Sequence, residues 1–176
     1  MGEMERQLEL VGDGTWEPIR VLFVCLGNIC RSPLAEAVFR HLVDERGWTE
    51  RFEIDSAGTS GWHRGSPPDA RSTEVARRRG IALTGGSRKV VAADLRRFHY
   101  VIAMDEENLD ALRELQASSG GTAQVRRLRE FEPCAASLDV PDPYYGGPRG
   151  FDDVHDIVER ASAGLLAHIA AEHELR

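Results

Sequence analysis

Several residue types and patterns are scarce or missing in this chain. No apolar run approaches the roughly 20 residues that a membrane-spanning helix needs, so we expect no membrane span. The chain has three cysteines, and this odd number argues against the disulfide scaffold of a small secreted domain. No further Cys or His pair follows Cys25 and Cys30 to complete a zinc site, and we expect neither a metal nor any other cofactor.

Basic residues are also outnumbered. The chain has 22 basic and 29 acidic residues, which gives a net charge of −7 at pH 7, and Lys89 is its only lysine. A nucleic-acid partner is therefore not expected, and the overall field of the protein mildly repels phosphate. Any phosphate site must obtain its attraction from nearby groups.

We expect no targeting signal in the N-terminal segment. The first ten residues, MGEMERQLEL, lack the basic and then apolar layout of a signal peptide, so we expect a cytoplasmic protein. Residues 1–18 show no periodicity, which predicts a loose N-terminal extension. Residues 19–176 contain no repeat and no linker, and with 41% hydrophobic residues in the chain they predict one globular domain.

One stretch, VLFVCLGNICRSPL at residues 21–34, has a clear local pattern. Val21 to Val24 are apolar and read as a buried strand. The pattern then breaks into a loop, Cys25 to Arg31. Ser32 can cap a helix, and Pro33 suits a first helical position, where its missing N–H costs nothing. The stretch predicts a strand, a loop and a helix start in direct succession.

The residues of this loop suit the binding of an oxyanion. Gly27 and Asn28 tolerate left-handed backbone, so the loop can curl until its N–H groups converge on one point at the helix N-terminus. Arg31 can hold two phosphate oxygens in a planar, bidentate grip. Cys25 lies at the floor of the ring, where the same donors stabilise a thiolate. The loop therefore predicts phosphoryl transfer, with a buried and inert Cys25 as the alternative.

Strands and helices alternate along the rest of the chain. Strands are expected at about 20–24, 52–58, 99–104 and 125–128, and helices at about 33–46, 69–79, 92–97, 106–116 and 152–173. This alternation predicts an α/β fold of Rossmann-like or flavodoxin-like type: one four-stranded parallel sheet with strand order 2-1-3-4 and helices on both faces. Ligands of such sheets bind beyond the carboxyl ends of the strands, which is where the Cys25 loop begins.

A second candidate region is the run VPDPYY at residues 140–145. A thiolate that attacks a phosphomonoester needs an acid to protonate the leaving oxygen. Two prolines hold Asp142 out of helical structure, so its carboxyl can project from a loop, and Tyr144 and Tyr145 place two rings beside it. The same residues equally suit a turn with both tyrosines in the core. From the residues alone, both interpretations stay open.

The run VCLGNICRSP at residues 24–33 resembles, residue for residue, the signature loop of the low-molecular-weight protein tyrosine phosphatases. The similarity extends over roughly residues 20–170. It implies that Cys25 is the nucleophile, that Arg31 binds the phosphate and that Asp142, in a DPYY loop, is the general acid. The residues that would bind the substrate are Leu26, Gly27, Asn28, Ile29, Cys30, Ser32, Trp62, Tyr144 and Tyr145.

The resemblance also assigns supporting residues. Ser32 would hydrogen-bond the Cys25 sulfur, Ser56 would brace Asn28, and Asp105 would orient Arg31 while also capping a helix. Gly85 stands where many relatives carry a His, so we expect the network around Asn28 to be shorter or water-filled.

The resemblance determines the roles of two residues near the opening of the expected substrate pocket less closely. Trp62 would form one wall, since an aromatic follows this Ser-Gly in similar phosphatases; the alternative is a partly buried surface Trp. His63 comes next, and we expect it to be a solvated surface residue. A reversible disulfide between Cys25 and Cys30 is a further hypothesis, because it would protect the nucleophile from over-oxidation.

These features predict a metal-independent phosphatase that hydrolyses phosphotyrosine in proteins or peptides through a phosphocysteine. A protein-arginine phosphatase is one alternative, but relatives with that preference tend to carry Thr where Ile29 stands. An arsenate reductase on the same fold is another, but such enzymes lack the DPYY acid. A non-catalytic phosphate-binding module would have lost Cys25, Arg31 or Asp142, and all three are present.

Overall fold

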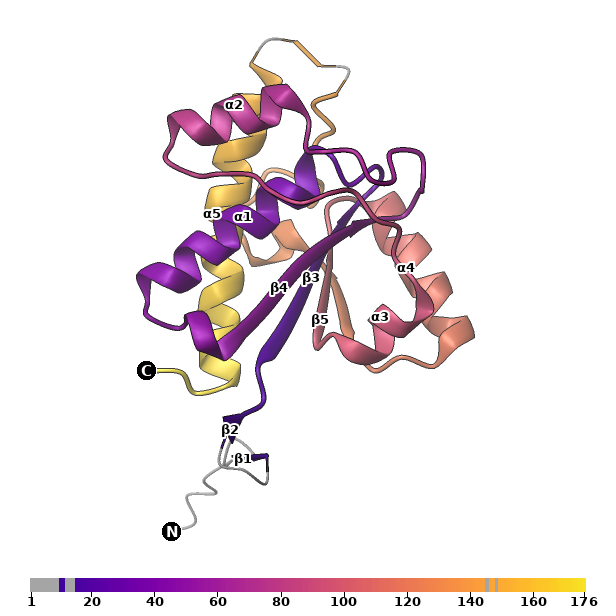
Figure 1. Cartoon of the computed structure of the whole chain (residues 1–176), viewed down its shortest axis with the longest axis vertical. Coiled ribbons are helices and arrows are strands. Elements are labelled where there is room, and N and C mark those ends of the chain that lie inside the picture. The colour runs from indigo at the N-terminus through magenta and orange to yellow at the C-terminus, as the bar shows by residue number, and fades with distance from the viewer. Residues whose placement is uncertain (1–9, 12–14, 145, 148) are drawn as a thin grey trace.

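A four-stranded parallel sheet forms the centre of the protein (Figure 1). The structure is a computed structural model that describes residues 10–11, 15–144, 146–147 and 149–176. The strands lie in the order β4-β3-β5-β6, which along the chain is 2-1-3-4, so the predicted fold class and strand order are confirmed. The strands are β3 (Ile19–Cys25), β4 (Phe52–Gly58), β5 (Tyr100–Ala103) and β6 (Gln124–Arg127).

The register of the sheet brings three strand ends together. Cys25 pairs with Gly58 across β3 and β4, and Val24 pairs with Ala103 across β3 and β5. The residues of β3 from Val21 to Cys25 are all buried, as expected for a central strand of a parallel sheet. The chain therefore leaves the sheet after Cys25 at its centre, beside the ends of both neighbouring strands.

Helices cover both faces of this sheet (Figure 1). On one face lie α1 (Arg31–Glu45) and α5 (Gly150–Glu172), and α2 (Ala70–Arg78) contacts both of them. On the other face lie α3 (Ala92–Arg97) and α4 (Glu106–Ser119). Each face of the sheet encloses a separate cluster of buried apolar side chains. In the described part of the chain, none of the helices has the length and apolar character needed to cross a membrane.

Short elements complete the described structure. In the segment expected to be a loose extension, β1 (Leu10–Val11) pairs antiparallel with β2 (Thr15–Trp16). This hairpin lies at the opposite end of the molecule from the loop after β3 (Figure 1). The 3-10 helices η1 (Thr49–Arg51) and η2 (Leu128–Phe131) follow α1 and β6. The division of the chain at residue 18 stays a prediction.

The start of α1 differs from the sequence-based expectation. Cys30, not Ser32, is the N-cap residue, no side chain caps the helix, and Pro33 is its third residue. Pro33 is tolerated there because the N–H groups of the first helical turn have no intrahelical acceptor. The Ser32 hydroxyl lies 3.0 Å from the Cys25 sulfur instead. The prediction that Ser32 caps α1 was therefore wrong, since this hydroxyl is directed at the sulfur.

Candidate active site

The loop after β3 curls around the sulfur of Cys25. Its turn is made at Asn28, which has a φ of 55°, in the left-handed region that few residues other than Gly adopt. The Asn28 N–H donates to the Cys25 sulfur at 3.2 Å. Within the described residues, the N–H groups of Gly27, Ile29, Cys30 and Arg31 have no protein acceptor. Four unpaired donors in a curled loop at a helix N-terminus are an arrangement that binds an oxyanion.

A network of hydrogen bonds holds Asn28 in this conformation. Its side-chain Nδ2 donates to Ser32 Oγ at 2.8 Å and to Ser56 Oγ at 3.0 Å. Its Oδ1 accepts from the Arg88 N–H at 3.0 Å. The amide is 4% exposed, so these bonds also satisfy polar atoms that would be costly to bury alone. The network ties the loop to α1, to β4 and to the segment after residue 85.

The guanidinium of Arg31 is fixed from behind. It is buried, and its Nη1 donates to Asp105 Oδ2 at 2.6 Å and to the Val140 carbonyl oxygen at 3.0 Å. Asp105 also caps α4, because its Oδ1 accepts from the Asn108 N–H. Burial acts to lower the pKa of Arg31, but the negative groups of Cys25 and Asp105 outweigh it and raise this pKa. Arg31 therefore stays charged and in one orientation.

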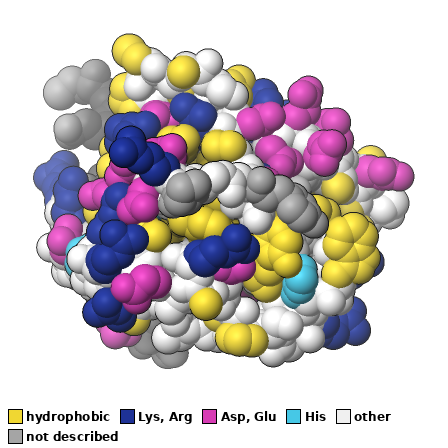
Figure 2. All heavy atoms as spheres, turned by 90° about the horizontal axis from the view of Figure 1, so that it is seen from above, with side chains coloured by type: hydrophobic (Ala, Val, Ile, Leu, Met, Phe, Trp, Pro, Cys, Tyr) yellow, Lys and Arg dark blue, Asp and Glu magenta, His cyan; other side chains and the backbone are white. Residues whose placement is uncertain are grey.

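The loop forms the floor of a cavity of about 250 Å³. Figure 2 looks onto this end of the molecule, where hydrophobic side chains gather beside a histidine. Trp62 and Tyr144 form the rim, with 79% and 37% of their surfaces exposed, so both rings are accessible to a substrate. The residues that line the cavity are Cys25, Leu26, Gly27, Ile29, Cys30, Arg31, Trp62, His63, Asp142 and Tyr144.

Most of the residues singled out in the sequence therefore meet at one place. Asn28, Ser32, Ser56 and Asp105 support the cavity from behind, through the hydrogen bonds already given. Tyr145 lies outside the described residues. His63, expected on the solvated surface, lines the cavity as well.

The loop that carries Asp142 is held over the cavity by several contacts. Asp142 Oδ2 lies 3.5 Å from Arg31 Nη2, and Asp142 Oδ1 accepts from the Tyr144 N–H at 3.0 Å. The Arg71 guanidinium lies 5.2 Å from the centre of the Tyr144 ring and 4.6 Å from that of Phe151, at cation–π distance. Arg71 had no signal in the sequence, because a helical Arg is usually a solvated residue.

Gly58 is a second residue that sequence reasoning missed. It was assigned only as the end of a strand, but the loop passes directly over it. A Cβ at this position would lie 2.7 Å from the Leu26 carbonyl oxygen and 3.2 Å from the backbone nitrogen of Asn28. A glycine at the end of a strand that precedes a ligand-binding segment is the signal that could have identified this close approach.

Gly85 faces a polar cavity behind the loop. It has a φ of +89° and nothing within 4 Å of its would-be Cβ. Gly85, Asn28, Ser56 and Glu36 are among the residues around a cavity of about 280 Å³. The side chain of Asn28 is nevertheless fully hydrogen-bonded without a His at position 85, because its Oδ1 accepts from the Arg88 N–H.

The two cysteines of the loop differ in environment. Both are free and buried. Burial, together with the charges of Asp69 and Cys25, raises the pKa of Cys30 to about 12. Cys30 is therefore a neutral thiol at neutral pH, which leaves Cys25, with its Ser32 and Asn28 contacts, as the candidate nucleophile.

Comparison with known proteins identifies the family. A model of the family described as Low molecular weight phosphotyrosine protein phosphatase matches residues 20–175. A low molecular weight protein-tyrosine-phosphatase from Streptomyces coelicolor is 46% identical over 159 residues, covering 89% of this chain and 97% of that protein. The chain therefore belongs to the low molecular weight phosphotyrosine protein phosphatase family.

Two solved structures agree with this assignment. The crystal structure of YfkJ from Bacillus subtilis matches with a TM-score of 0.83 and 42% identity, covering 90% of this chain and 99% of its own. The crystal structure of an arginine phosphatase from Drosophila matches with a TM-score of 0.82 and 32% identity, covering 86% of this chain and 98% of its own. One fold thus carries relatives named for different phosphorylated substrates.

Substitution of Gly58 tests the close approach. Gly58→Ala should displace the loop, because the new Cβ would overlap the Leu26 carbonyl oxygen. A displacement near 1 Å can cost about 100-fold in rate, so we expect kcat/KM for an aryl phosphate to fall at least tenfold. Gly147→Ala is the control, since no atom of the described residues lies within 4 Å of its would-be Cβ. Activity of Gly58→Ala within twofold of wild type would contradict this packing.

The partly buried carboxyl of Glu36 gives a pH-dependent test. Burial raises the pKa of Glu36 from 4.5 to about 7, against the attraction of Arg40. The folded protein thus holds this proton more tightly than the unfolded chain. Stability from this group is present below about pH 4.5 and is lost as pH rises through about 7. We expect a loss of up to about 3 kcal/mol in the free energy of unfolding across this range.

Glu36→Gln should remove that loss, and urea unfolding at about pH 5 and about pH 8 measures it. Glu45→Gln, on the exposed side of the same helix, is the control. Equal pH dependence of Glu36→Gln and wild type would rule out a raised pKa at Glu36.

Proposed function

We propose that this protein hydrolyses phosphotyrosine in proteins or peptides through a phosphocysteine at Cys25. The observation that supports this most directly is that Cys25, Arg31 and Asp142 line one cavity, although Arg31 and Asp142 are 111 residues apart in the sequence. A nucleophile, an anion-binding group and an acid that face one space are the requirements of phosphomonoester hydrolysis.

In the first step the Cys25 thiolate forms a bond to phosphorus while the bond from phosphorus to the phenolic oxygen breaks. Asp142 gives its proton to that oxygen, so tyrosine leaves as a neutral phenol. In the second step the Asp142 carboxylate accepts a proton from a water molecule, whose oxygen bonds to phosphorus. The bond from sulfur to phosphorus then breaks, and phosphate and the Cys25 thiolate are released.

The remaining groups stabilise charge during both steps. The unpaired N–H groups of the loop and the Arg31 guanidinium bind the phosphoryl oxygens, where negative charge is carried in the transition state. Ser32 Oγ, 3.0 Å from the sulfur, can donate to the thiolate when it acts as leaving group in the second step. No group from a cofactor is needed in this scheme.

Phosphotyrosine is favoured over phosphoarginine by the side chains around the cavity. Leu26, Ile29, Trp62 and Tyr144 present apolar or aromatic surface to the space above the loop, which suits a planar ring. Ile29 also offers no hydrogen-bond acceptor or donor to a guanidinium. A protein-arginine phosphatase is the alternative, since the Drosophila relative is named an arginine phosphatase, but the family model and the Streptomyces coelicolor relative are named for phosphotyrosine or tyrosine.

Arsenate reduction is less well supported. Cys30 is buried and its pKa is raised to about 12, so it is poorly suited to the thiol exchange that such a reaction needs. Asp142, by contrast, lines the cavity, which supports its role as the acid for a leaving phenol. A cytoplasmic location stays a prediction from the sequence.

Asp142→Asn tests the role of the acid. Loss of general acid and base catalysis should lower kcat for a phosphotyrosine peptide by about 10²- to 10⁴-fold, because an unprotonated phenolate leaves poorly. Steady-state kinetics measures this loss, and Asp153→Asn, on the exposed side of the first turn of α5, is the control. A kcat for Asp142→Asn within threefold of wild type would show that another group supplies the proton.

Ile29→Thr tests the substrate class. We expect wild type to prefer a phosphotyrosine peptide to a phosphoarginine peptide of the same sequence. The smaller, polar Thr should shift the ratio of the two kcat/KM values towards phosphoarginine by about tenfold, the usual order for one pocket group. Thermal melting checks that the variant is folded. A wild type that prefers phosphoarginine would overturn the phosphotyrosine assignment.

A further inference from the structure

Two loops beside the cavity are fixed to its floor by hydrogen bonds. The Ser60 N–H and Oγ both donate to the Leu26 carbonyl oxygen, at 3.0 and 3.1 Å. Ser87 Oγ donates to the Gly27 carbonyl oxygen at 3.0 Å. The two loops are also joined to each other, because the Gly65 N–H donates to the Ser87 carbonyl oxygen and the Ser87 N–H to that of Ser66. The backbone of these loops therefore keeps a fixed relation to the phosphate site.

These loops carry two cations that meet next to Trp62. Arg64 Nη2 lies 3.6 Å, and Lys89 Cδ 3.9 Å, from the position that a Cβ of Gly61 would occupy. Gly61 directly precedes Trp62, which lines the cavity. Both basic residues are exposed. They thus form a basic pair, Arg64 and Lys89, at one side of the cavity mouth.

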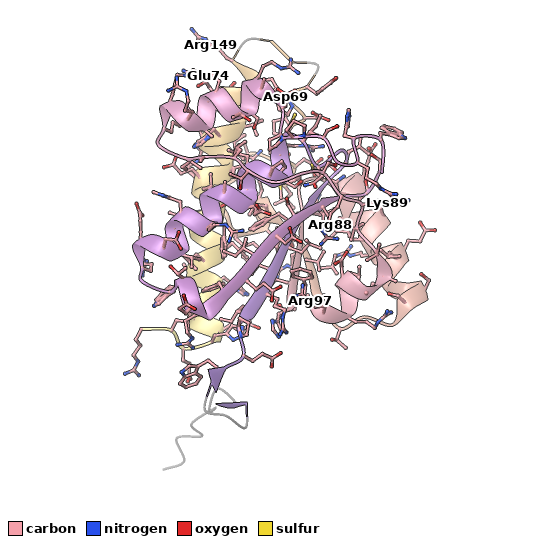
Figure 3. All side chains as sticks on the ribbon, in the orientation of Figure 1. Asp69, Glu74, Arg88, Lys89, Arg97 and Arg149 are labelled. Carbon is pink, nitrogen blue, oxygen red and sulfur yellow. The ribbon has the colours of Figure 1, made fainter. Side chains whose placement is uncertain are left out.

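In the part of the chain that the structure describes, no carboxylate neutralises this basic pair. Among the described residues, neither side chain forms an ion pair or donates a hydrogen bond. Arg88, which is labelled with Lys89 in Figure 3, differs from the basic pair. It forms ion pairs with Asp55 and Asp94. On the opposite side of the mouth, Arg71 is likewise paired, with Asp69. The basic pair therefore places unpaired positive charge beside the cavity, in a protein of net charge −7.

Arg64 and Lys89 carry charges of the same sign beside Gly61, and an anionic group placed between them would be attracted by both. A substrate peptide that inserts its phosphotyrosine into the cavity must pass its flanking residues over the rim. An extended peptide advances about 3.5 Å per residue, so a side chain within about three residues of the phosphotyrosine can reach Gly61 and its neighbours. A carboxylate there would meet both cations.

We propose that Arg64 and Lys89 form a subsite for an acidic side chain of the phosphorylated substrate, close to its phosphotyrosine. This inference rests on the proposed function and extends it to a substrate class, namely acidic phosphotyrosine peptides. The subsite acts on substrate binding and on the rate of encounter, so its effect lies in KM and weakens with salt.

Paired peptides test the subsite. Two phosphotyrosine peptides of one sequence carry either Glu or Gln at the flanking positions, and kcat/KM is measured for each at low and high salt. We expect wild type to prefer the Glu peptide by about three- to tenfold through KM, since an exposed ion pair contributes only modestly. The double variant Arg64→Ala/Lys89→Ala should lose this preference, and added salt should reduce it in wild type.

Two further variants make the result specific. Arg64→Glu/Lys89→Glu should prefer a peptide with Lys at the same positions. Arg113→Ala removes an exposed arginine of α4 that forms no ion pair in the described structure, and it should keep the preference for Glu. Hydrolysis of a small aryl phosphate, which has no flanking residues to reach Arg64 and Lys89, gives the reference rate for each variant.

The outcomes separate the two proposals. Equal hydrolysis of the Glu and Gln peptides by wild type, or a preference that survives in Arg64→Ala/Lys89→Ala, would overturn the subsite and leave the phosphatase assignment intact. Failure of wild type to hydrolyse either peptide or the aryl phosphate would overturn the proposed function, and the subsite with it.

Discussion

The left-handed conformation of Asn28 is the constraint on which the site depends. It turns the chain back over the Cys25 sulfur, which accepts from the Asn28 N–H. In the described part of the chain, the N–H groups of Gly27, Ile29, Cys30 and Arg31 are left without protein acceptors. Such a conformation is unfavourable for most residues, and it persists because Ser32, Ser56 and the Arg88 N–H bind the Asn28 amide. The hydrogen bonds of the folded protein thus hold the loop N–H groups in place for an anion before it binds.

The parallel sheet explains how such distant segments meet. The carboxyl ends of neighbouring strands lie at one edge, so the segments after β3, β4 and β5 begin within reach of one another. The first supplies Cys25 and Arg31, the second supplies Trp62, and the third supplies Asp105. Arg31 then connects this edge to the Asp142 loop through the Val140 carbonyl oxygen and Asp142 itself.

Much of this arrangement could be predicted from the sequence, because local patterns determine it. The strand at Phe52–Gly58 and the helix at Ala92–Arg97 have the expected bounds. Features that depend on contacts between distant segments were not predictable from periodicity. Ser32 caps no helix because its hydroxyl lies against the Cys25 sulfur. Gly58 must be a glycine because the loop after β3 passes too close to it for a Cβ. His63 lines a cavity that forms only when three loops come together.

The central claim is that one curled loop directs its N–H groups, a guanidinium and a sulfur at a single tetrahedral anion. A crystal structure with vanadate, which mimics the phosphoryl group in its transition state, tests this most directly. We expect vanadium bonded to the Cys25 sulfur, its equatorial oxygens hydrogen-bonded to the loop N–H groups and to Arg31, and Asp142 next to the apical oxygen opposite the sulfur. Vanadate bound elsewhere, or bound in the cavity without contact to Cys25, would contradict the claim.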